Sequence, residues 1–210
     1  MTKGNLVFLS ILFSGFIFGS STTARASEAC PNDMVKVDNF CIDRFEAPNV
    51  DGSLPMSAVL ATEGEKWCAE RGKALCTDVQ WEAACIGKSR NHFPYGDYYQ
   101  KGSCVDDKEW RLVTSADWRA IQKPNTPQGK ATIERLYQAE PSGKRYKCST
   151  TEGVYDLVGN VAEWVGNTRH AGKYNHVMKG GLWAGYWRGS PKSGCRSTNQ
   201  GHPGTLRSYE

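Results

Sequence analysis

Apolar positions first gather in one run near the N-terminus. Leu6 to Phe18 is a thirteen-residue apolar stretch, with Lys3 before it and Ala24-Arg25-Ala26 after it. A positive start, an apolar run of this length and an A-x-A site are typical of a secretory signal peptide, and the run is too short to span a membrane stably. We therefore expect residues 1–26 to be removed. The mature domain, residues 27–210, would be periplasmic or extracellular and would have no membrane span.

After this run, apolar residues alternate loosely from Asp33 to Asp43, which predicts a pair of strands around Asp38-Asn39. Much of the later chain is rich in Gly, Pro, Asn and aromatic residues and shows few long strands. The sequence has 7 Trp, 9 Tyr and 22 Gly. About 180 mature residues are enough for one domain with a real core. The pattern therefore predicts a single compact, loop-rich α+β domain.

Helix signals occur at three places. Thr62-Glu63-Gly64-Glu65 has the pattern of a capping box, and Gly72 would end the helix that it opens. A second box at Thr77-Asp78-Val79-Gln80 opens a helix that Gly87 would close. One more short helix is expected at Ala131 to Gln138.

All eight cysteines follow residue 26. They are Cys30, Cys41, Cys68, Cys76, Cys85, Cys104, Cys148 and Cys195. An even count behind a signal peptide favours disulfides over zinc, and the chain has no C-x-x-C motif. Each bridge should add on the order of 2–4 kcal/mol of stability. We expect Cys30 and Cys41 to close a small N-terminal loop.

The charge pattern gives no sign of a surface for phosphate groups. The chain has 26 Lys and Arg against 22 Asp and Glu, and two of the basic residues, Lys3 and Arg25, lie in the expected signal peptide. The mature net charge is therefore +2, with both signs mixed along the chain. This composition argues against a nucleic-acid partner.

The stretch "GVYDLVGNVAEW", Gly153 to Trp164, places Asp156, Asn160 and Glu163 among apolar residues. The residues alone leave three interpretations open: a solvated turn, a metal-binding loop, or a catalytic acid pair. An acid pair would need a partner base and a pKa shifted toward neutrality, and the sequence identifies neither.

Several segments together resemble the formylglycine-generating enzyme, or sulfatase-modifying factor, family. They are "FCIDRFEAPN", "WCAERGKALCTDVQWEAAC", "FPYGD", "GVYDLVGNVAEW" and "MKGGLW". Their order and spacing follow the family from about residue 30 onward. The resemblance implies the irregular, loop-rich C-type-lectin-like α+β fold of that family.

The resemblance also favours the metal interpretation of the acidic loop. In the family this loop binds a structural Ca²⁺. The matching positions imply Asp156 and Glu163 as side-chain ligands, with the carbonyl oxygens of Gly159 and Val161 as backbone ligands. Calcium takes six to eight oxygen ligands in flexible geometry, so the set is chemically sensible. The alternative is that the two acids cap turns or pair with Arg or Lys.

Copper chemistry is not expected to survive in this chain. Family enzymes oxidise a sulfatase cysteine to formylglycine with O₂ and a copper(I) held by two thiolates, shortly after a K-G-G segment. Here no cysteine follows that segment before Cys195, and Ala184 stands at the first ligand position. The second position falls around Arg188 and Gly189. The resemblance pairs Cys195 with Cys85, and a bridged sulfur is a poor copper(I) ligand. We therefore assign no catalytic residue.

The remaining cysteines are less constrained. Cys104 and Cys148 are a candidate pair, although spacing does not determine connectivity. Cys68 could pair with Cys76, pair elsewhere, or stay free.

These features predict an exported, calcium-stabilised domain that acts by binding. The expected groove would be lined by Trp183, Tyr186, Trp187 and Arg188, and its partner would be a peptide, a glycan or an envelope protein. The alternative for these side chains is a place in the core. A second functional class is a formylglycine-generating-type oxidoreductase with relocated thiols. A third is an assembly partner that binds no small ligand.

Overall fold

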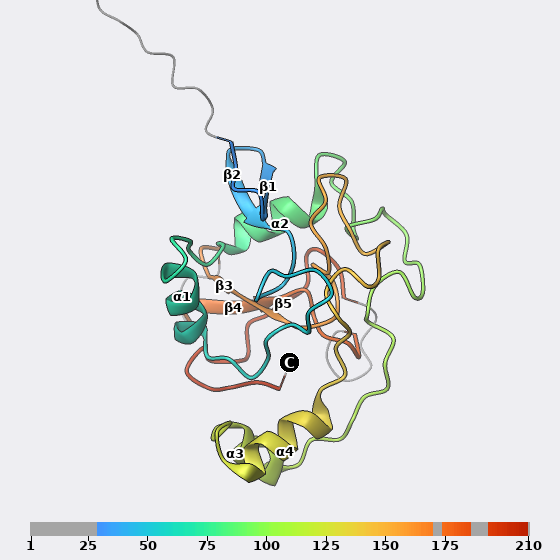
Figure 1. The fold of residues 1–210 in the computed structure, drawn as a ribbon. Coiled ribbons are helices and arrows are strands. Elements are labelled where there is room, and N and C mark those ends of the chain that lie inside the picture. The colour runs from blue at the N-terminus through green and yellow to red at the C-terminus, as the bar shows by residue number, and fades with distance from the viewer. Residues whose placement is uncertain (1–28, 170–173, 186–192, 210) are drawn as a thin grey trace, which may run out of the picture.

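The computed structural model describes residues 29–169, 174–185 and 193–209. The predicted signal peptide, residues 1–26, lies outside them. The described chain combines short helices with two small antiparallel sheets and long irregular connections (Figure 1). This is the expected C-type-lectin-like α+β fold. Among the described residues, no helix is long and apolar enough to cross a membrane.

The first sheet is the predicted hairpin. Strand β1 (Met34–Val37) pairs with β2 (Phe40–Asp43), with Val35 opposite Ile42. These two side chains belong to the main core. Asp38 makes the turn at a φ of 47°, in the left-handed region that Asp tolerates better than most residues.

The second sheet lies near the middle of the molecule. Its strand order is β3-β4-β5, with β3 spanning Glu163–Gly166, β4 His176–Lys179 and β5 Thr198–Asn199. Both neighbouring pairs are antiparallel. Because β3 follows "GVYDLVGNVA" directly, the acidic loop is attached to a central strand.

Helix α1 (Ala61–Ala69) starts two residues earlier than its predicted cap at Thr62 would allow. Its N-cap is Leu60, and the Glu63 carboxylate accepts a hydrogen bond from the Leu60 backbone N–H at 3.0 Å. The prediction that Thr62 opens the capping box was wrong. Thr62 already lies inside the helix, because Glu63 can reach back only to the residue three positions earlier.

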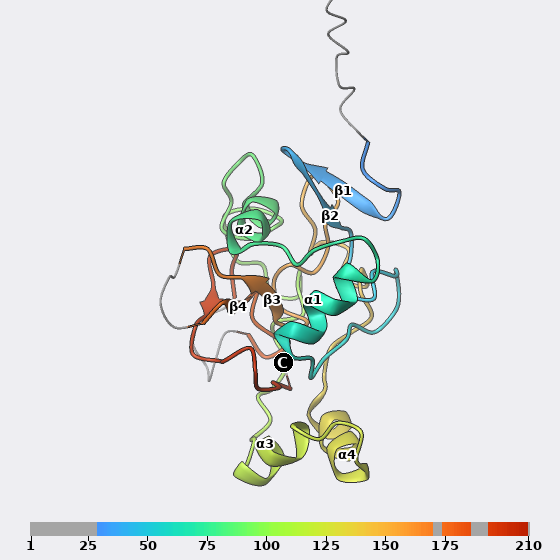
Figure 2. The same cartoon turned by 90° about the vertical axis from the view of Figure 1, so that its left-hand side faces the viewer.

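Helix α2 (Asp78–Ile86) has the predicted ends. The Thr77 hydroxyl accepts from the Gln80 N–H at 3.1 Å, and Gln80 accepts from the Thr77 N–H at 2.9 Å. Gly87 is the C-cap, at a φ of 55°. Figure 2 shows α1 and α2 as separate elements, and each of them contacts β3.

Helices α3 (Ser115–Ile121) and α4 (Pro127–Leu136) pack against each other. They lie together at one end of the molecule (Figure 1). Helix α3 was not predicted from the sequence. Helix α4 begins four residues before the start of the helix expected at Ala131 to Gln138. Pro127 suits the first turn of a helix, where its missing N–H is not needed. Gly129 is required for the close approach, since a Cβ there would lie 2.1 Å from the Lys123 carbonyl oxygen.

Two hydrophobic clusters and three disulfides hold these parts together. The main cluster includes Trp81, Val158 and Val165, and the second includes Ile121 and Trp183. The disulfides join Cys30 to Cys41, Cys85 to Cys195, and Cys104 to Cys148, which are the expected pairs. Cys68 and Cys76 are free.

Candidate functional site

The acidic loop before β3 is bent tightly by four residues with positive φ. These angles are 90° at Gly153, 59° at Asp156, 79° at Gly159 and 52° at Asn160. Only glycine fits at position 159, because a Cβ there would lie 2.3 Å from the Val105 carbonyl oxygen. The Asn160 N–H donates to that same carbonyl at 2.7 Å. The bends therefore depend on contact with the segment that carries Val105.

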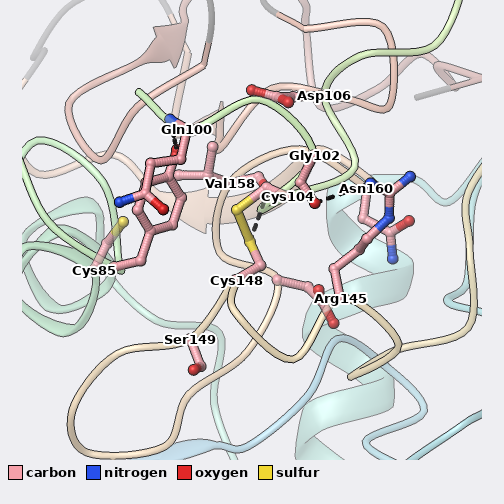
Figure 3. Close-up of a disulfide and its surroundings, with 12 residues drawn as sticks. Cys85, Gln100, Gly102, Cys104, Asp106, Arg145, Cys148, Ser149, Val158 and Asn160 are labelled. Carbon is pink, nitrogen blue, oxygen red and sulfur yellow. Dashed lines mark hydrogen bonds between the residues drawn. A yellow bond between two sulfur atoms is a disulfide. The ribbon is translucent and has the colours of Figure 1, made fainter. Parts of the chain in front are cut away.

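The disulfide between Cys104 and Cys148 joins the segment that carries Val105 to a second segment that also contacts the loop (Figure 3). Both cysteines are fully buried, and the Val158 carbonyl oxygen lies 3.4 Å from Cys148 Sγ. Asp156 donates its backbone N–H to the Cys148 carbonyl at 2.9 Å. The loop is thus held between two covalently joined segments.

Three carboxylates gather around the loop. Asp156 is 2% exposed, Glu46 is 5% exposed and Glu163 is partly buried. Asp156 accepts from the Gly143 N–H at 2.7 Å, and Glu163 accepts from the Trp81 indole N–H at 3.1 Å. One oxygen of each of these two carboxylates therefore has a hydrogen-bond donor.

Glu46 is bound more fully than the other two acids. Its carboxylate accepts from the Val161 N–H at 3.1 Å and from the Asn160 side-chain amide at 2.7 Å. The Ser142 hydroxyl donates to it at 3.3 Å. Glu46 therefore fixes the loop in place with direct hydrogen bonds.

The three acids lack a compensating positive charge among the described side chains. No salt bridge there reaches Glu46, Asp156 or Glu163. Burial is the main cause that raises the pKa of Asp156 to about 6 and that of Glu163 to about 7, and the charge of Asp156 adds to the shift of Glu163. Burial and the charges of its two neighbours also raise the pKa of Glu46 well above its ordinary value. Without a bound cation, this cluster favours protonation.

The oxygen atoms at the loop fit a hard cation. Among the described residues, the carbonyl oxygens of Gly159 and Val161 accept no hydrogen bond. Together with Asp156 and Glu163 they are the four positions expected to bind calcium, and all are oxygen donors. In the same part of the chain, no three His, Cys, Asp or Glu side chains lie close enough to bind a metal by themselves. A bound ion would therefore depend on the backbone carbonyls.

Sequence reasoning missed two residues of this cluster, Glu46 and the side-chain role of Asn160. Glu46 stands in the "FCIDRFEAPN" segment, far from the loop in sequence. Its contact with Asn160 spans 114 positions. The only signal for it was its place in a segment that resembles the family.

The expected binding groove is only partly described. Trp183 is 1% exposed and packs edge-on against Tyr137, with ring centroids 5.4 Å apart. The prediction that Trp183 lines a groove was wrong, because its ring fills the second core. Tyr186, Trp187 and Arg188 lie outside the described residues.

A polar surface pocket of about 760 Å³ lies near the Cys85–Cys195 disulfide. It is lined by both signs of charge. Its ionisable lining residues are Glu82, His92, Asp97, Arg169 and Arg196. Arg196 is exposed there.

Comparison with known proteins agrees with the geometry of the fold. The family model described as "Sulfatase-modifying factor enzyme 1-like domain" matches residues 13–207. Two curated relatives are both described as "Inactive C-alpha-formylglycine-generating enzyme 2". The one from Mus musculus is 26% identical over 149 residues, which cover 70% of this chain and 43% of the relative. The one from Bos taurus is 26% identical over 148 residues, which cover 70% and 44%. The chain thus spans less than half the length of these relatives.

Proposed function

Because the chain belongs to the sulfatase-modifying factor family, with its formylglycine-generating-enzyme-like domain, we propose that it is an exported, calcium-stabilised binding domain without copper-dependent oxidase activity. The observation that carries the proposal is the state of Cys195. It is the only cysteine after the K-G-G segment, and it is bridged to Cys85. The position that should supply two thiolates to copper(I) therefore supplies none.

Two further findings support the loss of oxidase chemistry. Leu182, just after the K-G-G segment, stands where the family resemblance implies an active-site Ser; it is 2% exposed and packs in the second core. The relatives from mouse and cattle are themselves described as inactive. The three disulfides are consistent with a periplasmic or extracellular location.

The oxidase question has a direct test. The mature protein, loaded with copper(I), is incubated in air with a cysteine-containing peptide, and the peptide is followed by mass spectrometry. The expected result is an unchanged peptide. Conversion of the cysteine to an aldehyde would overturn the proposal and favour the oxidoreductase alternative, in which Cys68 and Cys76 would be the only available thiols.

Calcium would be held by the carboxylates of Asp156 and Glu163 and by the carbonyl oxygens of Gly159 and Val161. The ion would supply the positive charge that these buried acids lack, and it would fix the loop that leads into β3. Support comes from the two carboxylates, which have no salt-bridge partner among the described side chains, and from the two carbonyls, which accept no hydrogen bond from the described residues. The role is structural, since an acid bound to Ca²⁺ stays ionised.

Thermal unfolding with and without calcium tests this site. A ligand at 100 times its Kd stabilises by about 2.7 kcal/mol, which corresponds to roughly 5–10 °C in Tm for a domain of this size. We expect such a rise for the wild type with calcium and its reversal by a chelator. Asp156→Asn and Glu163→Gln should each lose the response.

Glu70→Gln is the matched control, since Glu70 is exposed and, among the described residues, its carboxylate pairs only with Lys66 on α1. This variant should respond to calcium as the wild type does. An absent response in the wild type, or an equal response in Asp156→Asn, would contradict the calcium proposal.

The binding role is assigned to the polar pocket around Arg196. Its mixed charges suit a peptide or a glycan, because both present charged and hydrogen-bonding groups. Panels of short peptides and of oligosaccharides, measured by thermal shift, should give hits that Arg196→Ala weakens. Hits that Arg196→Ala leaves unchanged would place binding elsewhere. No hits at all would favour an assembly role.

A further inference from the structure

A second cavity, of about 190 Å³, lies between α1, β2 and β3. Its wall is mostly apolar and includes Trp67, Trp81 and Trp164. The cavity is distinct from the polar pocket around Arg196, with which it shares no lining residue. Both free cysteines, Cys68 and Cys76, face it.

The main chain holds both cysteines at this wall. The Cys68 carbonyl, in the last turn of α1, accepts from the N–H groups of Arg71 and Lys73 at 2.9 Å each. The Cys76 carbonyl accepts from the Gly166 N–H at 2.9 Å, which ties the start of α2 to β3. Residues 69–75 link the two positions through a turn with Gly72 at a φ of 66°. The link is short, and both of its ends are fixed.

The surroundings of the two sulfurs disfavour thiolates. Burial, followed by the charges of Glu163 and Cys68, raises the pKa of Cys76 to about 12. Burial and Asp43 also raise the pKa of Cys68, against a smaller opposing effect of Lys73 and Arg71. A monovalent metal held by two thiolates would leave one net negative charge near the carboxylates of Glu163 and Asp43. Two thiols and a disulfide are both neutral, so the pair can change its redox state here without placing a charge beside the carboxylates.

We propose that Cys68 and Cys76 are a redox pair that closes into a fourth disulfide across the wall of this cavity. In the reaction, both S–H bonds break and one S–S bond forms. Two electrons and two protons pass to a small-molecule disulfide, which is reduced to two thiols. The bridge would fix the end of α1 to the segment before α2 and so limit the movement of these two parts of the cavity wall.

The test equilibrates the mature protein in buffers of reduced and oxidised glutathione. Thiols are then alkylated under denaturing conditions and counted by intact mass. Going from reducing to oxidising buffer, we expect two alkylated cysteines to fall to none, with the mass lower by two hydrogen atoms and no glutathione attached. Peptide mapping should give a Cys68–Cys76 cross-link. Two alkylated thiols throughout, or glutathione adducts on both, would overturn the proposal.

Single variants provide the control for proximity. Cys68→Ser and Cys76→Ser each keep one thiol, which should be alkylated or carry glutathione and should never disappear without an adduct. Tryptophan fluorescence gives a second readout, because Trp67 and Trp81 line the same cavity. Fluorescence should change with the buffer in the wild type and stay constant in the double variant Cys68→Ser/Cys76→Ser. An equal change in the double variant would contradict the inference.

Discussion

Asn160 is a buried residue whose side-chain amide joins the segment of Glu46 to that of Glu140. Its NH₂ group donates to Glu46 at 2.7 Å and to the Glu140 carbonyl at 3.1 Å, while its oxygen accepts from the Glu140 N–H at 2.9 Å. The residue is 1% exposed. Because the Glu46 carboxylate is also buried, Asn160 supplies hydrogen bonds that water cannot easily replace.

We expect Asn160→Ala to lower the free energy of unfolding by about 2–4 kcal/mol, since it removes one of the donors to the buried Glu46 carboxylate and the hydrogen bonds to the Glu140 backbone N–H and carbonyl. Urea denaturation of the two proteins measures this loss. Asn175→Ala is the control, because Asn175 is exposed and bonds Asn167 only through its backbone carbonyl. Equal losses in both variants would contradict the assignment.

The acidic loop could be predicted at the level of its own residues but not of its partners. The spacing of Asp156 and Glu163, with a Gly-Asn bend between them, was visible in one short stretch. The approach of Glu46 was not, because no local pattern reports a contact across more than a hundred positions. Trp183 shows the same limit, since an aromatic residue in a Gly-rich segment fits a groove and a core equally well.

The ends of helices α1 and α2 contrast a wrong prediction with a correct one. Each segment has a Thr followed three residues later by Glu or Gln, the pattern of a capping box. Only Thr77 caps its helix. In α1 the glutamate at position 63 reaches back to Leu60, so Thr62 is an exposed helical residue. Glu63 and Glu65 could each close a capping box three residues earlier, at Leu60 or at Thr62. Tertiary contacts select the box that Glu63 closes. Arg207 binds the Glu63 carboxylate and favours the earlier start.

Threonine-to-alanine variants separate these two roles. Thr77→Ala removes the cap of α2 and should cost about 1 kcal/mol. Thr62→Ala should change stability by less than about 0.5 kcal/mol, because alanine is the better helix former at an exposed interior position. Thermal or chemical denaturation measures both values. A larger loss for Thr62→Ala would restore the cap predicted from the sequence.

At the scale of the whole molecule, the fold class and the Cys85–Cys195 pair were predictable from the family resemblance, and the Cys30–Cys41 pair from its place near the N-terminus. Cys104–Cys148 was only a candidate pair, and neither α3 nor the start of α4 was predicted. The two helices are joined by a close contact at Gly129 and by the ion pair between Arg135 and Asp117, in a segment whose Pro and Gly are also typical of a loop. Periodicity is a weak signal for helices this short.

Glu140 is the centre of a group of ion pairs that joins two parts of the chain. Its carboxylate pairs with Arg145 at 2.9 Å and with Lys108 at 2.6 Å, and its side chain is only 12% exposed. The Arg145 guanidinium also donates to the Gly102 carbonyl at 3.0 Å, beside the disulfide in Figure 3. Two segments, residues 102–108 and 140–145, are therefore joined around one carboxylate that is distinct from the candidate calcium ligands.

This meeting point should govern part of the acid stability of the protein. Hydrogen bonds and charge from Arg145, together with Lys108, lower the pKa of Glu140 to about 2. Its contribution is therefore fully present above the unfolded pKa of about 4.5 and is lost as the pH falls toward about 2; the linkage amounts to roughly 3 kcal/mol at most. Glu140→Gln should be less stable than the wild type near neutral pH, and the difference should shrink in acid. Glu109→Gln, at an exposed position, should follow the wild type throughout. Urea denaturation across this range measures the difference, and a constant gap between wild type and Glu140→Gln would show that the ion pairs do not set the acid limit.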